Sequence, residues 1–214
     1  KLFGKPLPTE VKNGLKAELR TLNNHHYAPL VLMWYEMVSA ARKMGAKMGK
    51  DRGFAKNSLL LYSLGITQDR PTDFGEAFCD YINHKQGLPA LECEFDKEGR
   101  ERVLKWIVER YGEQSVANIA SRNVFTAKTA STGGVQEEKL VGVLRKMDIH
   151  SCGVAICDGD ISEHVPLAWV ESAEYKDAVV VTQYGGDTLR RIGVPVLYFL
   201  TSNTLHYNSE EDAE

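Results

Sequence analysis

The sequence has few of the signals that place a chain in a class at once. Its four cysteines, Cys79, Cys93, Cys152 and Cys157, form no CxxC pair. A chain of 214 residues can bury a core large enough to fold without disulfides, so we expect reduced thiols, as in the cytosol. The longest apolar run of the N-terminal half, 29–35, is too short to cross a bilayer, and we expect no signal peptide. These absences predict a cytoplasmic protein.

Common catalytic motifs and a strong net charge are also missing. The 26 Lys and Arg residues and 29 Asp and Glu residues give a formal charge of -3, which provides no global field for phosphate backbones. There is no Walker loop, HExxH motif, GxSxG elbow or regular Cys/His metal spacing. Any nucleic-acid site must therefore be local. The densest basic cluster, Arg42, Lys43, Lys47 and Lys50, is typical of a solvated face and is the first place to expect such a contact.

Hydrophobic spacing predicts a helical first half and a second half rich in strands. We expect helices over 9–22, 30–44, 54–64, 73–83, 96–111 and 135–147. We expect strands over 91–95, 153–157, 178–184 and 194–200. Thr9 is the expected N-cap of the first helix, and residues 116–130 fit either helix or strand. This order favours one α+β domain over a regularly alternating α/β one.

Six strings occur in a fixed order along the chain. They are FGKPLPTEVKNGLKAEL, MGKDRGFAKNSLLLYSLGIT, LPALECEF, FTAKTA, IHSCGVAI with the later VPL and VVTQY, and VLYFLTSNTL. Together they cover most of the chain between Phe3 and Asn208. In this order they resemble the palm region of the bacterial DNA polymerase III alpha subunit, a C-family replicative polymerase. The resemblance implies a nucleotidyltransferase-like, polymerase-beta-like palm with a mixed sheet flanked by helices.

The resemblance also implies a domain organisation. The palm-like domain would cover 1–208, with a fingers segment shortened to about 131–140, and an acidic tail would cover 209–214. The family's exonuclease-like, thumb and clamp-binding parts have no match in this sequence.

The resemblance places two acidic residues and one tyrosine at the family's catalytic positions. Glu92 and Glu94 stand where the family has two aspartates on one strand face, and Tyr198 stands at the third aspartate. Two-metal phosphoryl transfer needs carboxylate ligands, and a tyrosine hydroxyl is neutral near pH 7. The pair would hold a metal weakly, if at all, so no cofactor is expected, or Mg²⁺ if the protein is active. Alternation alone also explains the pair as the solvated outer face of an amphipathic strand.

The string 48–67 resembles the family's glycine-rich phosphate cradle in an altered form. Arg52, Gly53 and Ser58 match and are candidate nucleotide-binding residues, whereas Asp51 and Phe54 replace small residues. A phosphate approaches such a turn only where side chains are small. The alternative is a helix start capped by Asp51 and stapled by Phe54.

Two further positions match the family's nucleotide-binding residues. Lys128 corresponds to a triphosphate-contacting lysine and His150 to the histidine of an HxxGVVI string. A single Lys on a helix is usually solvated, and a single His beside a strand is usually structural. Arg122 would add positive charge nearby.

Three functions stay open at this point. The first is a catalytically degenerate palm, a pseudoenzyme that binds DNA or a replication protein and no membrane. The second is an active nucleotidyltransferase or DNA-directed DNA polymerase that uses Glu92 and Glu94 as metal ligands with a carboxylate recruited from Asp187 or Asp96. The third is a pure protein-interaction domain. The sequence sets no oligomeric state.

Overall fold

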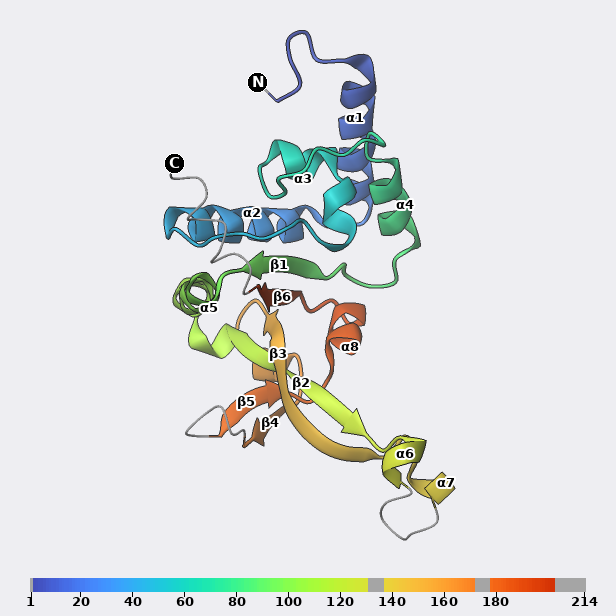
Figure 1. Cartoon of the computed structure of the whole chain (residues 1–214), viewed down its shortest axis with the longest axis vertical. Helices are drawn as coiled ribbons and strands as arrows, with labels where there is room; N and C mark the ends of the chain where they lie inside the picture. The colour runs from blue at the N-terminus through green and yellow to red at the C-terminus, as the bar shows by residue number, and fades with distance from the viewer. Residues whose placement is uncertain (1, 131–136, 172–177, 203–214) are drawn as a thin grey trace, which may run out of the picture.

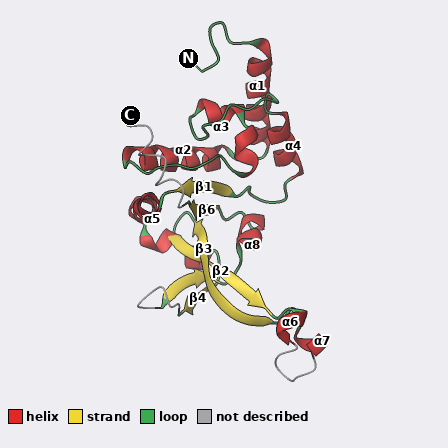
Figure 2. Cartoon of the chain, in the orientation of Figure 1, coloured by secondary structure: helices red, strands yellow, loops and turns green. Residues whose placement is uncertain are grey.

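The computed structural model describes residues 2–130, 137–171 and 178–202. Helices gather in the N-terminal part and strands in the C-terminal part, as Figure 2 shows by colour. The first four α-helices are α1 (Thr9–Asn24), α2 (Ala28–Lys43), α3 (Leu59–Ser63) and α4 (Glu76–His84). They form a layer beside strand β1 (Leu91–Phe95) in Figure 1. The helices predicted over 9–22, 30–44 and 73–83 are confirmed, as is the strand over 91–95.

The start of α1 differs from the prediction. Thr9 is the first helical residue and not the N-cap, so its predicted capping role is wrong. Pro8 stands at the N-cap, and its carbonyl accepts the first helical hydrogen bond, from the Lys12 backbone N–H at 3.0 Å. Because a proline lacks a side-chain acceptor, no side chain caps this helix end.

The single helix predicted over 54–64 is interrupted. A 3₁₀ helix, η1 (Gly53–Asn57), comes first, and α3 follows after one extended residue, Ser58. The Ser58 hydroxyl accepts a hydrogen bond from the Leu61 backbone N–H at 3.0 Å, which makes it the N-cap of α3. The apolar spacing of this segment is helical throughout, and only the cap residue separates the two pieces.

The strands form one six-stranded mixed sheet in the order β1-β6-β3-β2-β5-β4. The remaining strands are β2 (Val116–Val124), β3 (Leu144–Ile156), β4 (Leu167–Val170), β5 (Val179–Thr182) and β6 (Val196–Thr201). The pairs β1–β6 and β2–β5 are parallel, and the other neighbouring pairs are antiparallel. The expected α+β class, with a mixed sheet flanked by helices, is confirmed.

Alternation along β1 and β6 divides the side chains between the two faces of the sheet. Leu91, Cys93 and Phe95 of β1 are buried in a core with α2, α4 and α5 (Lys97–Tyr111). Helix α8 (Gly186–Arg191) packs on the other face, where Leu189 is buried against Val196 of β6. The even-numbered residues of β1 therefore point away from the main core, toward the face that carries α8.

The helix predicted over 135–147 is mostly wrong. Within the described part of this range, which starts at 137, only α7 (Glu137–Leu140) is helical, and β3 begins at Leu144. Gly142, with φ of +87°, ends the turn after α7, and strand β3 then pairs with β2 as a long antiparallel hairpin. Val, Leu and Met occur in both helices and strands, and here the pairing with β2 makes the segment from Leu144 onward a strand. Strand β4 was not predicted.

The ambiguous stretch 116–130 contains both element types, since β2 precedes helix α6 (Ala127–Ala130). Most of the expected fingers segment, 131–136, and the whole acidic tail, 209–214, lie outside the described residues. Among the helices that the structure describes, none is both long and apolar enough to cross a membrane.

Candidate functional site

Parallel pairing of β1 and β6 brings the first and third predicted catalytic positions together. Glu92 is the direct register partner of Tyr198, and Gly153 of β3 lies opposite Tyr198 on the other side. Side chains of register partners in a sheet point to the same face. The structure therefore joins residues that are more than a hundred positions apart in the sequence.

Glu94 does not lie on a solvated strand face. Its side chain is only 10% exposed, and the Arg52 guanidinium contacts it through Nε at 3.1 Å and Nη2 at 3.0 Å from Oε2. Gly49 leaves room for the carboxylate, because a Cβ at this position would lie 2.6 Å from Glu94 side-chain atoms. The solvated-face interpretation is therefore wrong for Glu94, whose charge is already paired.

Tyr198 is half-buried, and its environment holds it neutral. Burial raises the pKa of its hydroxyl above the ordinary value, although the nearby Arg190 guanidinium opposes this. The His150 ring lies 5.4 Å from the Tyr198 ring, and burial lowers the pKa of His150. Both groups are therefore uncharged near neutral pH, and neither supplies an anionic ligand. Gly186 of α8 leaves the space that the Tyr198 hydroxyl occupies.

The altered glycine-rich segment forms a small cavity beside Glu92. Its volume is about 380 Å³, and its lining consists of Gly53, Phe54, Asn57, Ala77, Tyr81, Ala90 and Glu92. Gly53 has φ of +58°, and a Cβ there would lie 3.6 Å from the Glu92 carboxylate. The Phe54 ring stacks on the Tyr81 ring with centroids 5.0 Å apart and planes at 8°. The benzyl group of Phe54 thus forms part of the cavity wall, beside the turn at which the resemblance would place a phosphate.

Asp51 has a different role from the predicted helix cap. Its Oδ2 accepts hydrogen bonds from the backbone N–H groups of Gln68 at 2.6 Å and Asp69 at 2.7 Å, in the loop after α3. The carboxylate therefore ties the start of η1 to the far end of α3, and the capping prediction for Asp51 is wrong.

Ser58 lies beneath the surface, where its side chain has structural partners. The residue is fully buried, and its hydroxyl donates to Glu18 Oε2 at 2.6 Å. Phe54 packs in an aromatic group with Trp34, Phe78 and Tyr81 instead of stapling a helix end. Of the segment's candidate nucleotide contacts, Arg52 and Gly53 are the exposed ones.

The cavity at Gly53 and the side chains of Glu92, Glu94 and Tyr198 beside it are called the cleft below, and the other predicted residues lie inside or outside it. Lys128 lies on α6, which Figure 1 shows at the far tip of the β2–β3 hairpin, away from β1 and β6. Asp96 is buried and accepts a hydrogen bond from the Lys47 backbone N–H at 3.0 Å. Asp187 lies on α8 and pairs with Arg190. The structure thus joins Arg52, Gly53, Glu92, Glu94, His150 and Tyr198, and leaves Lys128 apart.

Arg190 is a site residue that the sequence did not indicate. It is only 8% exposed, and its charge acts on both Tyr81 and Tyr198. An arginine in the last turn of a short helix is ordinarily a solvated side chain that offsets the helix dipole. No sequence pattern distinguishes this buried arginine from its exposed neighbour Arg191.

The residues of the cleft do not match a two-metal centre. The structure, over its described ranges, has no cluster of three or more His, Cys, Asp and Glu side chains that would hold a metal ion. Such a centre needs several hard oxygen ligands that converge on one point. Here Glu94 is paired with Arg52, and the third position is a neutral tyrosine.

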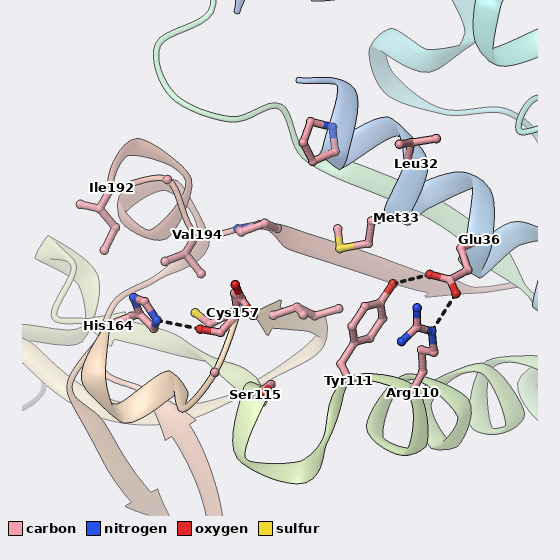
Figure 3. Close-up of a pocket in the computed structure, with 16 residues that line it drawn as sticks. Leu32, Met33, Glu36, Arg110, Tyr111, Ser115, Cys157, His164, Ile192 and Val194 are labelled. Carbon is pink, nitrogen blue, oxygen red and sulfur yellow. Dashed lines mark hydrogen bonds and ion pairs between the residues drawn. The ribbon is translucent and has the colours of Figure 1, made fainter. Parts of the chain in front are cut away.

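A larger cavity, of about 820 Å³, lies elsewhere between α2, the end of α5 and the loop before β6 (Figure 3). Its polar lining includes a hydrogen-bond network. The Glu36 carboxylate accepts one hydrogen bond from Arg110 Nε at 2.7 Å and another from the Tyr111 hydroxyl at 3.3 Å. Burial, followed by the Glu36 charge, raises the pKa of Tyr111 to about 12. None of the predicted site residues lines this cavity.

Comparisons with known proteins point to one family. The model of the bacterial DNA polymerase III alpha NTPase domain matches residues 1–137. The DNA polymerase III subunit alpha of Chlamydia trachomatis is 24% identical over 247 residues, which cover 92% of this chain and 20% of that protein.

Shorter matches give higher identity. The DNA polymerase III subunit alpha of Aquifex aeolicus is 31% identical over 53% of this chain and 10% of its own length. The error-prone DNA polymerase 2 of Rhizobium meliloti is 32% identical over 58% of this chain and 11% of its own length. The chain therefore spans at most about a fifth of these relatives.

Proposed function

The chain belongs to the family of the bacterial DNA polymerase III alpha NTPase domain, and we propose that it is a catalytically degenerate, nucleotidyltransferase-like palm that binds nucleic acid. The observation that carries the proposal is the ion pair between Arg52 and Glu94 beside the Glu92–Tyr198 register pair. A second partner class, a replication protein, fits the same role. In either case the domain works as a binding module.

Charge balance supports the loss of catalysis. A divalent cation at Glu94 would have to displace a guanidinium that already sits within 3.1 Å of the same carboxylate oxygen. Mg²⁺ requires near-ideal octahedral oxygen ligands, and an arginine beside them repels it. If a Mg²⁺ ion were held, Glu92 and Glu94 would be its protein ligands, and it would stabilise charge on a transferred phosphoryl group. Tyr198 would add no anionic ligand.

An active nucleotidyltransferase is the second candidate. Glu92 favours it, because this carboxylate borders a cavity of about 380 Å³ together with the backbone of Gly53. Either Asp187 or Asp96 would have to supply a further ligand. Asp96 is buried and accepts from the Lys47 backbone N–H, whereas Asp187 is 82% exposed and would have to leave its ion pair with Arg190, so Asp187 is the more accessible source.

Primer extension tests the proposal directly. A primed DNA template is incubated with the four deoxynucleotides and either Mg²⁺ or Mn²⁺, and the product of the wild type is compared with that of Glu92→Gln. We expect no incorporation by either. Incorporation that Glu92→Gln abolishes would overturn the proposal and support the second candidate.

A metal titration makes the test independent of parts of the relatives that this chain does not contain. Mn²⁺ binding followed by electron paramagnetic resonance measures the bound metal without requiring turnover. We expect no site of micromolar affinity in the wild type. Two tight Mn²⁺ ions would contradict the proposed degeneracy even if incorporation were absent.

A further inference from the structure

A second small cavity lies between the end of α4 and helix α8, next to the cleft. Its volume is about 360 Å³, and the residues that line it are His84, Lys85, Gln86, Asp187, Arg190 and Arg191. All six side chains are polar or charged. Ligand cavities of about 300–1,000 Å³ are usually mostly apolar with a few polar groups. This composition suits a small, strongly hydrated ligand.

The charges of this cavity are mostly positive, although the chain as a whole carries -3. Lys85, Arg190 and Arg191 are basic residues, and Asp187 is the one acidic residue in the lining. The Asp187 side chain is 82% exposed and pairs with Arg190. Lys85 and Arg191 form no ion pair with any residue that the structure describes. The cavity therefore has a net positive charge and attracts an anion.

Arg190 is built into the wall of the cavity. Its side chain is 9% exposed, and it donates from Nη1 to the Leu88 carbonyl at 3.3 Å. Its Nε is buried and finds no hydrogen-bond acceptor among the residues with described positions. Dipole compensation at the end of α8 explains a basic residue there, but it does not explain why this guanidinium is buried. A buried cation with an incomplete set of acceptors favours an anionic ligand nearby.

The loop that carries Lys85 is fixed against α8. The Leu88 backbone N–H donates to the Arg190 carbonyl at 2.9 Å, and the Tyr27 hydroxyl donates to the Gly87 carbonyl at 2.9 Å. Gly87 has φ of +74°, and a Cβ there would lie 2.6 Å from the Arg190 carbonyl oxygen. This close approach fixes the position of the loop that carries Lys85 relative to the helix that carries Arg190 and Arg191. A preorganised site loses less entropy when a ligand binds.

The cavity adjoins the cleft through helix α4. Tyr81 of α4 lines the Glu92 cavity, and Lys85, the residue that follows α4, places its ammonium 5.8 Å from the centroid of the Tyr81 ring. Arg190 also acts on the charge states of Tyr81 and Tyr198. The basic cavity and the Glu92 cavity are therefore neighbours, and the contact between Lys85 and Tyr81 lies between them.

We propose that this basic cavity binds a phosphate group, with Lys85, Arg190 and Arg191 as the recognising cations. The phosphate belongs to a nucleic-acid strand or to a free nucleotide, and the two share the same chemistry. The inference rests on the proposed nucleic-acid-binding role, but it does not depend on the loss of catalysis. Arginine binds phosphate through paired donors and lysine as a point charge.

The test uses a fluorescein-labelled oligodeoxynucleotide and fluorescence anisotropy in the presence of EDTA. The double variant Lys85→Gln/Arg191→Gln changes the two cations without ion pairs and leaves the buried Arg190 in place. A matched control, Lys16→Gln/Arg20→Gln, removes one lysine and one arginine charge from exposed residues of α1, away from the cavity and from the basic cluster at 42–50. Thermal unfolding verifies that both variants fold.

We expect the cavity variant to lose at least tenfold in oligonucleotide affinity and the control less than twofold. The slope of log affinity against log salt should fall by about 1.4, since each lost phosphate contact on single strands contributes about 0.7. An equal loss in both double variants would overturn the proposal, because it would show only a general charge effect. An unchanged affinity in the cavity variant would overturn it as well.

A calorimetric titration with a deoxynucleoside triphosphate in EDTA separates the two phosphate sources. Strand binding without triphosphate binding assigns the site to the nucleic-acid backbone, and triphosphate binding that the cavity variant loses assigns it to a free nucleotide. Absence of both in the wild type overturns this inference and the nucleic-acid-binding role together. Incorporation in primer extension, in contrast, removes only the proposed loss of catalysis.

Discussion

The Arg52 guanidinium and the Glu94 carboxylate form an ion pair, with Nη2 3.0 Å from Oε2. Arg52 comes from the altered glycine-rich segment and Glu94 from β1, so two predicted site residues neutralise each other. The arginine side chain is 43% exposed, whereas the glutamate side chain is only 10% exposed. The partly exposed partner can move away, but the carboxylate stays in place on the strand.

Removal of the arginine should therefore free a metal ligand. We expect Arg52→Ala to raise the Mn²⁺ affinity at least tenfold, because a positive charge about 3 Å from the ligand oxygen opposes cation binding by more than about 1.4 kcal/mol even in a partly solvated site. Electron paramagnetic resonance measures the bound fraction. Arg20→Ala, an exposed arginine on α1, is the control and should change nothing. An Arg52→Ala protein with unaltered Mn²⁺ binding would show that Glu94 does not face the cleft.

A third carboxylate can be restored at position 198. Tyr198→Asp places an aspartate opposite Glu92 in the strand register. In EDTA we expect a loss of about 2 kcal/mol in the free energy of unfolding, because an unpaired charge replaces a half-buried ring. Mn²⁺ at ten times its dissociation constant should return about 1.4 kcal/mol. Urea unfolding with and without Mn²⁺ gives both values, and Tyr198→Phe should show no response to the metal. Equal stabilities of Tyr198→Asp with and without Mn²⁺ would contradict the shared face.

The local sequence pattern was sufficient to predict the strand that carries Glu92 and Glu94. Leu91, Cys93 and Phe95 alternate with Glu92 and Glu94, and the structure forms β1 over these five residues. The period of two is unambiguous because each apolar residue has a charged neighbour. Family resemblance then supplied the opposite position, Tyr198, which no local pattern connects to β1.

Tertiary contacts decided what the sequence could not show. The segment that begins with Leu144 becomes a strand because it pairs with β2, and its residues suit a helix equally well. Ser58 breaks a helical stretch because its hydroxyl and the two following N–H groups share the buried carboxylate of Glu18, forty residues earlier. The burial of Arg190 likewise depends on the packing of α8 against the loop before β1.

Cys93 should be the least reactive of the four thiols. It is buried on β1, accepts a hydrogen bond from Trp34 Nε1 at 3.1 Å, and burial raises its pKa to about 12. The other three cysteines are half-buried, and burial raises their pKa values too, but less. At pH 8 we expect Cys93 to react with a disulfide reagent at least 100-fold more slowly than Cys152, because thiolate supply and access both limit it. Mass spectrometry after timed labelling measures each site, and similar rates would contradict the buried position.

Glu18 provides the most specific link between packing and pH. Its carboxylate is fully buried and accepts from the Ser58 hydroxyl at 2.6 Å and from the Leu59 and Leu60 backbone N–H groups at 2.7 and 2.9 Å. Glu18→Ala removes the acceptor of all three hydrogen bonds and leaves their buried donors without a partner. We expect it to lower the free energy of unfolding by about 3 kcal/mol. Urea unfolding measures this loss. The exposed Glu101→Ala on α5 should stay within about 0.5 kcal/mol of the wild type.

The pH dependence of Glu18 has a definite sign. Burial raises the pKa of this carboxyl in the folded state above its ordinary value of 4.5. The folded protein therefore binds more protons than the unfolded chain between the two pKa values, and this contribution to stability is complete below pH 4.5. It is lost as the pH rises through the folded-state pKa.

The difference in the free energy of unfolding between wild type and Glu18→Gln isolates this effect, since all other titrating groups are common to both proteins. We expect the wild type to lose stability relative to Glu18→Gln as the pH rises from 4.5 to 7. A relative gain of the wild type over this range would show that the three donors outweigh desolvation. In that case Glu18 would be held as a carboxylate that stabilises the start of α3, and the break at Ser58 would depend on its charge.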